Sequence, residues 1–127
     1  MRIVLAAAAL AVSVFQGTAQ QERRVVRVAA ERFSFTPSRI ELDAGEEIEL
    51  VVTSDDTAHG LRIQGTEIDR TIPKRGSGEI RVTVKFDEPG SYTFECSRVC
   101  GAGHNFMRGT LRVKARRSSS ITGGQSK

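Results

Sequence analysis

The chain has 127 residues, a length that favours one compact domain over several. Its hydrophobic content of 39% and charged content of 27% are those of an ordinary soluble globular protein. The net charge of +4 is too small to indicate a nucleic-acid-binding protein, so no nucleic-acid partner is expected.

The first segment, residues 1–19, has the pattern of a signal peptide. Arg2 precedes the uncharged apolar run Ile3–Phe15, and residues 17–19 are the small residues that a signal peptidase reads. The run is shorter than the roughly 20 residues of a membrane-spanning helix, so no transmembrane helix is expected; a retained, poorly inserted anchor is the alternative. The segment predicts an exported protein, periplasmic or secreted.

Residues 20–114 have the pattern of short strands separated by turns. Apolar and polar residues alternate, or short apolar runs occur, at 25–29, 32–35, 39–42, 47–52, 61–63, 80–86, 92–94 and 110–113. Residues 66–78, with one Pro and two Gly, are expected to cross the surface without regular structure. No segment predicts a helix, and this spacing favours an all-β fold, an antiparallel sandwich with Greek-key connections. The tail, 115–127, lacks apolar periodicity and is expected to be disordered.

Nearly all residues able to bind a soft metal are concentrated in one short segment, which contains Cys96, Cys100, His104 and Met107. His59 lies apart, in a polar stretch just before a predicted strand. Thiolate and thioether sulfur select soft metals such as copper, and imidazole also binds copper. Two His, one Cys and a weak axial Met describe a mononuclear blue copper site. The second Cys would let two thiolates bridge two copper ions, each of which also takes one His.

The pattern Cys-Ser-x-x-Cys-Gly-x-x-His-x-x-Met at 96–107 resembles the binuclear copper (CuA) motif of the soluble domain of cytochrome c oxidase subunit II. Further segments are similar to that family: Asp56-x-x-His59, Ile72-Pro73 with Gly76, and Pro89-Gly90-x-Tyr92. The resemblance covers about residues 50–113 and implies a cupredoxin-like Greek-key β-sandwich over 20–114.

The resemblance also implies a full set of copper ligands. Cys96 and Cys100 would bridge two copper ions, His59 and His104 would each bind one ion, and Met107 would complete one of them. A further ligand would be the backbone carbonyl of Arg98, at a position where the family usually has Glu. Every residue has this carbonyl, so the ligating atom is kept while the local charge changes sign.

For function, the resemblance implies a single-electron carrier that is not an enzyme on its own, and it suggests the module through which electrons enter an oxidase complex. The family uses a Trp-containing segment after its first His for this step, whereas Gly60-Leu61 follows His59 here and the chain has no Trp. Every charged residue from Cys96 onward is basic. The expected partner is therefore a redox protein with an acidic docking face.

Several alternatives stay open from the residues alone. The same donors suit an exported copper carrier or chaperone, or a mononuclear blue copper protein. A disulfide between Cys96 and Cys100 suits an exported protein but gives no role to the His and Met residues. A Cys₂His₂ zinc site leaves Met107 without a role. A Cys–His nucleophilic enzyme lacks a third member and a substrate cleft.

Overall fold

The computed structural model describes residues 11–17 and 22–116 of the chain. The predicted signal peptide, 1–19, and the predicted disordered tail, 115–127, therefore lie mostly outside the described residues. Residues 11–17 belong to no helix or strand. In these two described ranges, no helix is long and apolar enough to cross a membrane.

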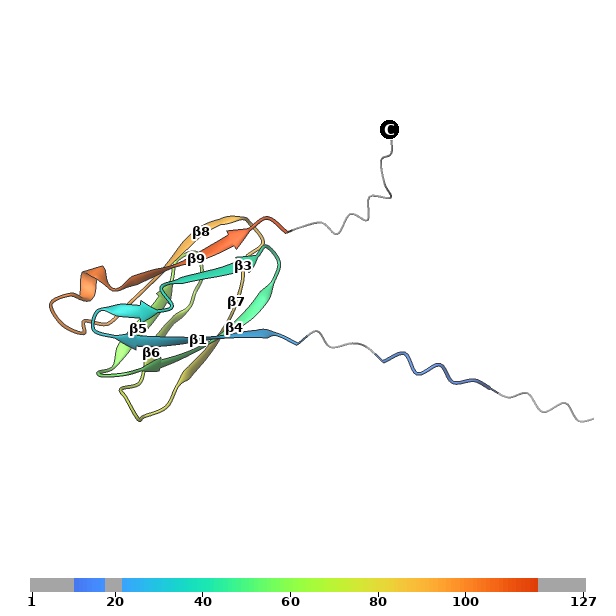
Figure 1. The fold of residues 1–127 in the computed structure, drawn as a ribbon, viewed down its shortest axis with the longest axis horizontal. Helices are drawn as coiled ribbons and strands as arrows, with labels where there is room; N and C mark the ends of the chain where they lie inside the picture. Colours follow the sequence, from blue (N-terminus) through green and yellow to red (C-terminus); the bar gives the residue numbers. More distant parts are fainter. Residues whose placement is uncertain (1–10, 18–21, 117–127) are drawn as a thin grey trace, which may run out of the picture.

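Two β-sheets form the described domain (Figure 1). The four-stranded sheet has the order β2-β1-β4-β7, with strands Ser34–Thr36, Arg24–Glu31, Glu47–Ser54 and Ile80–Lys85. The five-stranded sheet has the order β3-β9-β8-β5-β6, with strands Arg39–Asp43, Arg108–Lys114, Gly90–Glu95, His59–Ile63 and Asp69–Ile72. The predicted all-β sandwich is confirmed.

The core lies between the sheets, because alternating residues turn one face of each strand inward. In β7, every second residue from Ile80 to Val84 is buried and the residues between them are exposed. Phe35 of β2 and Phe94 of β8 meet edge to face, with ring centroids 5.1 Å apart. A fully buried Phe contributes about 1.5–3 kcal/mol of hydrophobic stabilisation, so this pair joins the two sheets firmly.

The expectation of a purely antiparallel sandwich is wrong in two places, because β1 pairs with β4, and β3 with β9, in parallel. Parallel neighbours need a crossover connection. Here β2 and β3 provide the connection between β1 and β4: the chain crosses to the other sheet as β3 and returns as β4. Residue alternation reports which face of a strand is buried and not the direction of its neighbour, so the sequence pattern could not distinguish these pairings.

Three local differences from the predicted elements concern short segments. Strand β6 lies within 66–78, where no regular structure was expected; only its last residue, Ile72, is buried, so it shows no alternation. The predicted strand 32–35 is interrupted, since Arg32 and Phe33 form the turn between β1 and β2. A single 3₁₀ turn, η1 (His104–Phe106), interrupts the long loop between β8 and β9.

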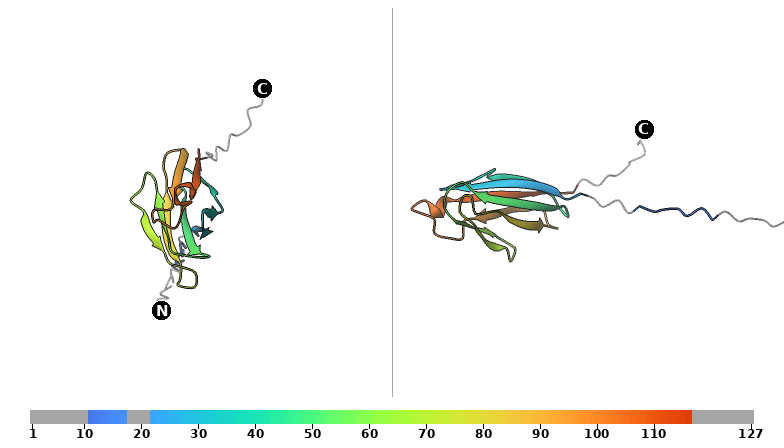
Figure 2. Two further views of the ribbon diagram at one scale, coloured as in Figure 1. Left: turned by 90° about the vertical axis from the view of Figure 1, so that its left-hand side faces the viewer. Right: turned by 90° about the horizontal axis from the view of Figure 1, so that it is seen from below.

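This β8–β9 loop projects at one end of the sandwich, at the left in Figure 1. The start of β1 and the end of β9 lie at the opposite end, and the view from below in Figure 2 shows the same separation. The predicted ligand segment is therefore held far from the points where the described domain begins and ends.

Candidate metal centre

The predicted ligands are placed by strand ends. Cys96 directly follows β8 and Met107 directly precedes β9. The Cys96 N–H donates to the Met107 carbonyl at 3.1 Å, which closes the base of the loop between them. His59 was expected in a polar loop, but β5 begins at this residue and its side chain is 0% exposed. The strand extends further back than its apolar residues indicate because His59 pairs with Ile72 of the missed strand β6.

The structure brings all the predicted donor atoms together. The two Sγ atoms, of Cys96 and Cys100, lie 3.8 Å apart. Beside Cys96 Sγ are His59 Nδ1 at 3.9 Å and the Arg98 carbonyl at 3.0 Å. Beside Cys100 Sγ are His104 Nδ1 at 3.8 Å and Met107 Sδ at 3.9 Å. Each thiol therefore has one imidazole and one weaker donor next to it.

These separations fit a shared soft metal. Imidazole and thiolate bind a transition ion such as zinc at about 2.0–2.3 Å, so two donors roughly 120° apart lie about 3.7 Å from each other. The donor atoms of His59, Cys96 and Cys100 all lie within 4.8 Å of one another. His104 joins this group through Cys100. The thioether of Met107 belongs to the same donor set, which favours copper over zinc.

Both thiols are free and buried. Burial raises the pKa of the Cys100 thiol to about 11, and the neighbouring Cys96 adds to this increase. A metal must displace the protons of such thiols when it binds, because the thiolate is the ligand. The thiol sulfur atoms, 3.8 Å apart, are also not joined as a disulfide, which needs an S–S distance of about 2.05 Å.

Asp56 orients the first imidazole. Its Oδ1 lies 2.6 Å from His59 Nε2, so a proton on Nε2 is donated to the carboxylate and Nδ1 is left facing Cys96. Burial alone would raise the pKa of Asp56, but hydrogen bonds from the Arg32 N–H and the His59 ring outweigh it and lower the pKa below its usual value. The carboxylate is thus kept charged beside the ring.

Gly60 lets β5 approach the cysteine loop. A Cβ atom at this position would lie 2.1 Å from Ser97 Oγ and 2.9 Å from two backbone nitrogens of the loop. The Gly60 N–H donates to Cys96 Sγ at 3.5 Å. Ser97 Oγ in turn donates to Asp69 of β6 at 2.7 Å, so both neighbouring strands hold the first half of the loop.

Sequence reasoning missed the residues that support the ligands from a distance. Arg32 donates through Nε to the Cys100 carbonyl at 2.8 Å, across 68 residues of sequence, and no local pattern could have indicated this contact. The Asp56-x-x-His59 spacing was a usable signal for the other support, because the carboxylate is only three residues from the ring in the chain.

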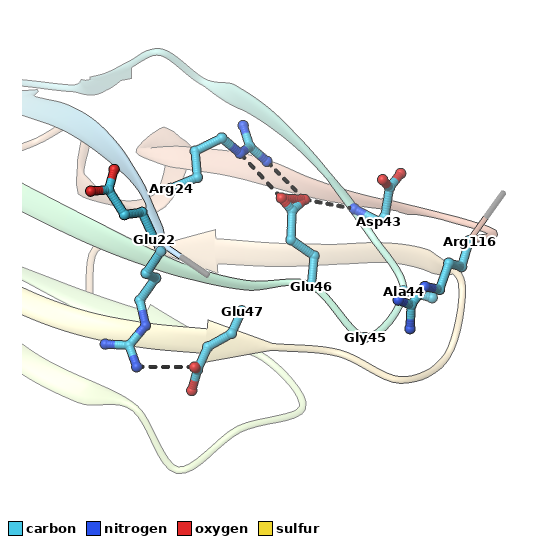
Figure 3. A pocket seen from close by; sticks show the side chains of 9 residues that line it. Glu22, Arg24, Asp43, Ala44, Gly45, Glu46, Glu47 and Arg116 are labelled. Atoms are coloured by element: carbon cyan, nitrogen blue, oxygen red, sulfur yellow. Dashed lines mark hydrogen bonds and ion pairs between the residues drawn. The ribbon is translucent and has the colours of Figure 1, made fainter. Parts of the chain in front are cut away.

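A hollow at the other end of the sandwich has a different character from the donor set (Figure 3). Charged side chains dominate its lining, and they pair with one another: Arg24 with Glu46 at 3.2 Å and Arg23 with Glu47 at 3.0 Å. Its lining contains no His, Cys or Met. It is thus unrelated to the donor set.

Comparison with known proteins agrees with this geometry. A family model described as a cupredoxin-like domain matches residues 3–113. Cytochrome c oxidase subunit 2 of Thermus thermophilus is 38% identical over 89 residues, which are 70% of this chain and 64% of that protein. For the same subunit of another strain of this species the matched part is 52% of the protein, so this chain spans about half to two thirds of the length of these relatives.

Solved structures give the same picture. The structure of a heme-copper terminal oxidase dimer matches with a TM-score of 0.64 and 26% identity, over 72% of this chain and 65% of that one. The periplasmic domain of subunit II of cytochrome oxidase from Bradyrhizobium japonicum matches with a TM-score of 0.66 and 14% identity, over 76% of this chain and 87% of that one. At this lower identity the likeness concerns the fold alone.

Proposed function

This chain belongs to the cupredoxin-like domain family, and we propose that it is a copper-binding electron-transfer protein whose CuA-like centre holds two copper ions. The observation that carries the proposal is the division of the donor set. Cys96 has an imidazole and a carbonyl beside it, whereas Cys100 has an imidazole and a thioether. Two bridging thiolates with one such pair of donors on each side suit two adjacent ions.

The rigidity of the donor set supports electron transfer over copper delivery. His59 and Met107 are fully buried, and the two Cys are nearly so. His59 begins β5, Cys96 directly follows β8 and Met107 directly precedes β9, whereas Cys100 lies in the loop between β8 and β9. Copper bound there supplies a one-electron couple, and side chains locked in a core change position little when the oxidation state changes. A carrier must instead release its metal, which such buried donors oppose.

The decisive measurement is EPR spectroscopy with copper quantified per chain, on protein reconstituted under reducing conditions. We expect two coppers that share one unpaired electron, seen as hyperfine splitting from both nuclei. A single copper with hyperfine splitting from one nucleus would contradict the binuclear centre and favour a blue copper protein. EPR-silent Cu(I) that a chelator removes readily would favour a copper carrier.

We also propose an exported location, periplasmic or secreted, and a role as the module through which electrons enter a terminal oxidase. The names of the relatives support both parts: one is a subunit of cytochrome c oxidase and one structural neighbour is a periplasmic domain. On this proposal the chain carries electrons and catalyses no reaction on its own. Isolation of the native protein as a monomer without any oxidase component would count against the assembly role.

The partner is proposed to be a redox protein with an acidic rim around an apolar patch. Val99 and Phe106, which are 87% and 83% exposed, directly precede Cys100 and Met107 in the β8–β9 loop. Arg98, also exposed, makes no ion pair within 22–116. Exposed apolar side chains and an exposed positive charge on the same loop suit a partner whose patch is apolar in the centre and acidic at the edge.

A further inference from the structure

We propose that the β1–β2 corner, defined as Arg32 and Phe33, is a positioning element. It holds the ligand loop, which is the β8–β9 loop at residues 96–107, in register with His59. The inference rests on the proposed copper centre and adds to it two residues outside the donor set. The corner connects two strands of the four-stranded sheet, whereas the ligands lie at the start of β5 or in the loop between β8 and β9, which are strands of the five-stranded sheet. The corner therefore contacts, from the four-stranded sheet, a metal site that is built on the five-stranded sheet.

The side chain of Arg32 holds the second half of the ligand loop. Its Nε donates to the Cys100 carbonyl at 2.8 Å. A hydrogen bond from a charged donor is stronger than one between neutral groups. This bond fixes the backbone of Cys100, whose thiol lies beside His104 and Met107.

The backbone of Arg32 holds the imidazole of His59 in place through Asp56. The Arg32 N–H donates to Asp56 Oδ2 at 2.8 Å, and Asp56 Oδ1 lies 2.6 Å from His59 Nε2. One residue thus connects directly to the segment that bears Cys100 and, through one carboxylate, to the imidazole beside Cys96. A movement of the corner would change the separation of the two halves of the donor set.

The ring of Phe33 supports the loop from below. A Cβ atom at Gly103 would lie 2.3 Å from this ring, and one at Gly101 would lie 2.9 Å from it. Only glycine leaves room for the ring at these two positions. The loop segment before His104 therefore lies directly against this ring, which limits its movement.

This arrangement predicts a charge effect separate from the packing effect. The Arg32 guanidinium is a positive charge held close to Cys100, and a positive charge favours the state of the centre that has gained an electron. Loss of the charge should lower the reduction potential. Loss of the hydrogen bond should loosen Cys100 and speed the release of copper.

The test compares Arg32→Gln, Arg32→Lys and a matched control, Arg24→Gln, in the copper-loaded protein. Arg24 also donates a guanidinium N–H to a backbone carbonyl, that of Glu41 at 2.7 Å, but at the opposite end of the sandwich. We expect Arg32→Gln to release copper to a Cu(I) chelator about tenfold faster than wild type, the scale found when residues that support metal ligands are replaced. Its reduction potential should fall and its copper hyperfine couplings should change, while Arg24→Gln resembles wild type in all three.

Arg32→Lys keeps the charge and one donor, so it should keep the potential and partly restore slow release. Phe33→Leu should speed release without lowering the potential, because it removes packing and no charge. The inference is overturned if Arg32→Gln matches Arg24→Gln, if Lys restores nothing, or if the only effect is an equal loss of thermal stability with and without copper. Wild-type protein that fails to load copper would instead overturn the proposed function itself.

Discussion

At the scale of single residues, the two cysteines have unequal surroundings. Cys100 lies beside His104 and Met107, and His59 is within 4.8 Å of its sulfur. Replacing Cys96 with Ser therefore leaves one thiolate, two imidazoles and one thioether, which is the ligand set of a mononuclear blue copper site. We predict that Cys96→Ser binds one copper per chain and shows hyperfine splitting from a single nucleus in EPR.

The reciprocal variant is the control for this prediction. Cys100→Ser removes the thiolate that lies beside His104 and Met107. It leaves Cys96 with His59 and the Arg98 carbonyl. Its copper should be held more weakly and should lack a blue-type spectrum. If Cys96→Ser retains the spectrum of loaded wild-type protein, the bridging assignment is wrong; if the two variants behave alike, the inequality of the two cysteines is wrong.

At the scale of elements, strands with a clear inward face were predictable and their partners were not. The alternation of β7 predicted its position because each inward residue is apolar. Strand β6 has one buried residue and carries no such signal, although its pairing with β5 determines where His59 lies. Likewise, the closeness of Cys96, Cys100, His104 and Met107 was predictable from their motif, since they are close in sequence. The supporting corner at Arg32 was not, because it reaches Cys100 only after the two sheets pack.

The turn between β3 and β4 provides a prediction about pH. Glu46 accepts hydrogen bonds from Arg24 of β1 and from the Asp43 N–H (Figure 3). The turn is thereby tied to β1 of the four-stranded sheet and to the end of β3. Burial alone would raise the pKa of Glu46, but the hydrogen bond from Arg24, the Asp43 amide and nearby positive charges lower it below its usual value of 4.5. A lowered pKa in the folded state means that this carboxylate stabilises the fold above pH 4.5 and that the contribution disappears as pH falls through the lowered value.

We therefore expect metal-free Glu46→Gln to be less stable than wild type at pH 7 by about 0.5–1 kcal/mol, the scale of a partly exposed ion pair. The difference should vanish in acid, where wild type is protonated as well. Urea unfolding at both pH values measures it without screening the charges. Glu88→Gln is the control, because within residues 22–116 the Glu88 carboxylate makes no ion pair. A difference between wild type and Glu46→Gln that stays constant down to acid pH would show that the carboxylate charge is not responsible.

At the scale of the whole molecule, the two ends of the sandwich differ in how their charges are used. At the end where β1 begins, Arg23 and Arg24 are neutralised by Glu47 and Glu46. At the ligand end, the view in Figure 2 along the sandwich shows the β8–β9 loop facing outward. Arg98 on that loop is exposed and forms no direct ion pair within the described range 22–116, although its charge, after the hydrogen bonds from Ser97 and Arg62, helps to lower the pKa of Asp69. The end that carries the donor set thus combines an exposed positive charge with the exposed apolar side chains of Val99 and Phe106.

This asymmetry predicts how the protein meets its redox partner. Because opposite charges speed diffusional encounter, electron transfer with an acidic redox protein should be fast at low ionic strength and slow as salt is added. Arg98→Glu should slow the second-order reaction roughly tenfold at low salt and remove most of its salt dependence. Phe106→Ala should slow it at every ionic strength, since it removes apolar contact and no charge. Stopped-flow mixing with acidic and basic redox proteins measures both effects.

The control is Arg112→Glu, the same charge reversal on β9. Like Arg98, Arg112 is exposed and forms no direct ion pair in the 22–116 domain, but it lies in β9 and not in the β8–β9 loop. If Arg112→Glu slows the reaction as much as Arg98→Glu, the effect arises from net charge and not from a docking face. If the rate depends neither on ionic strength nor on the sign of the partner's charge, the acidic partner is wrong. A reaction that slows only when Arg98 or Phe106 is altered would place the route of the electron at the exposed edge of the β8–β9 loop.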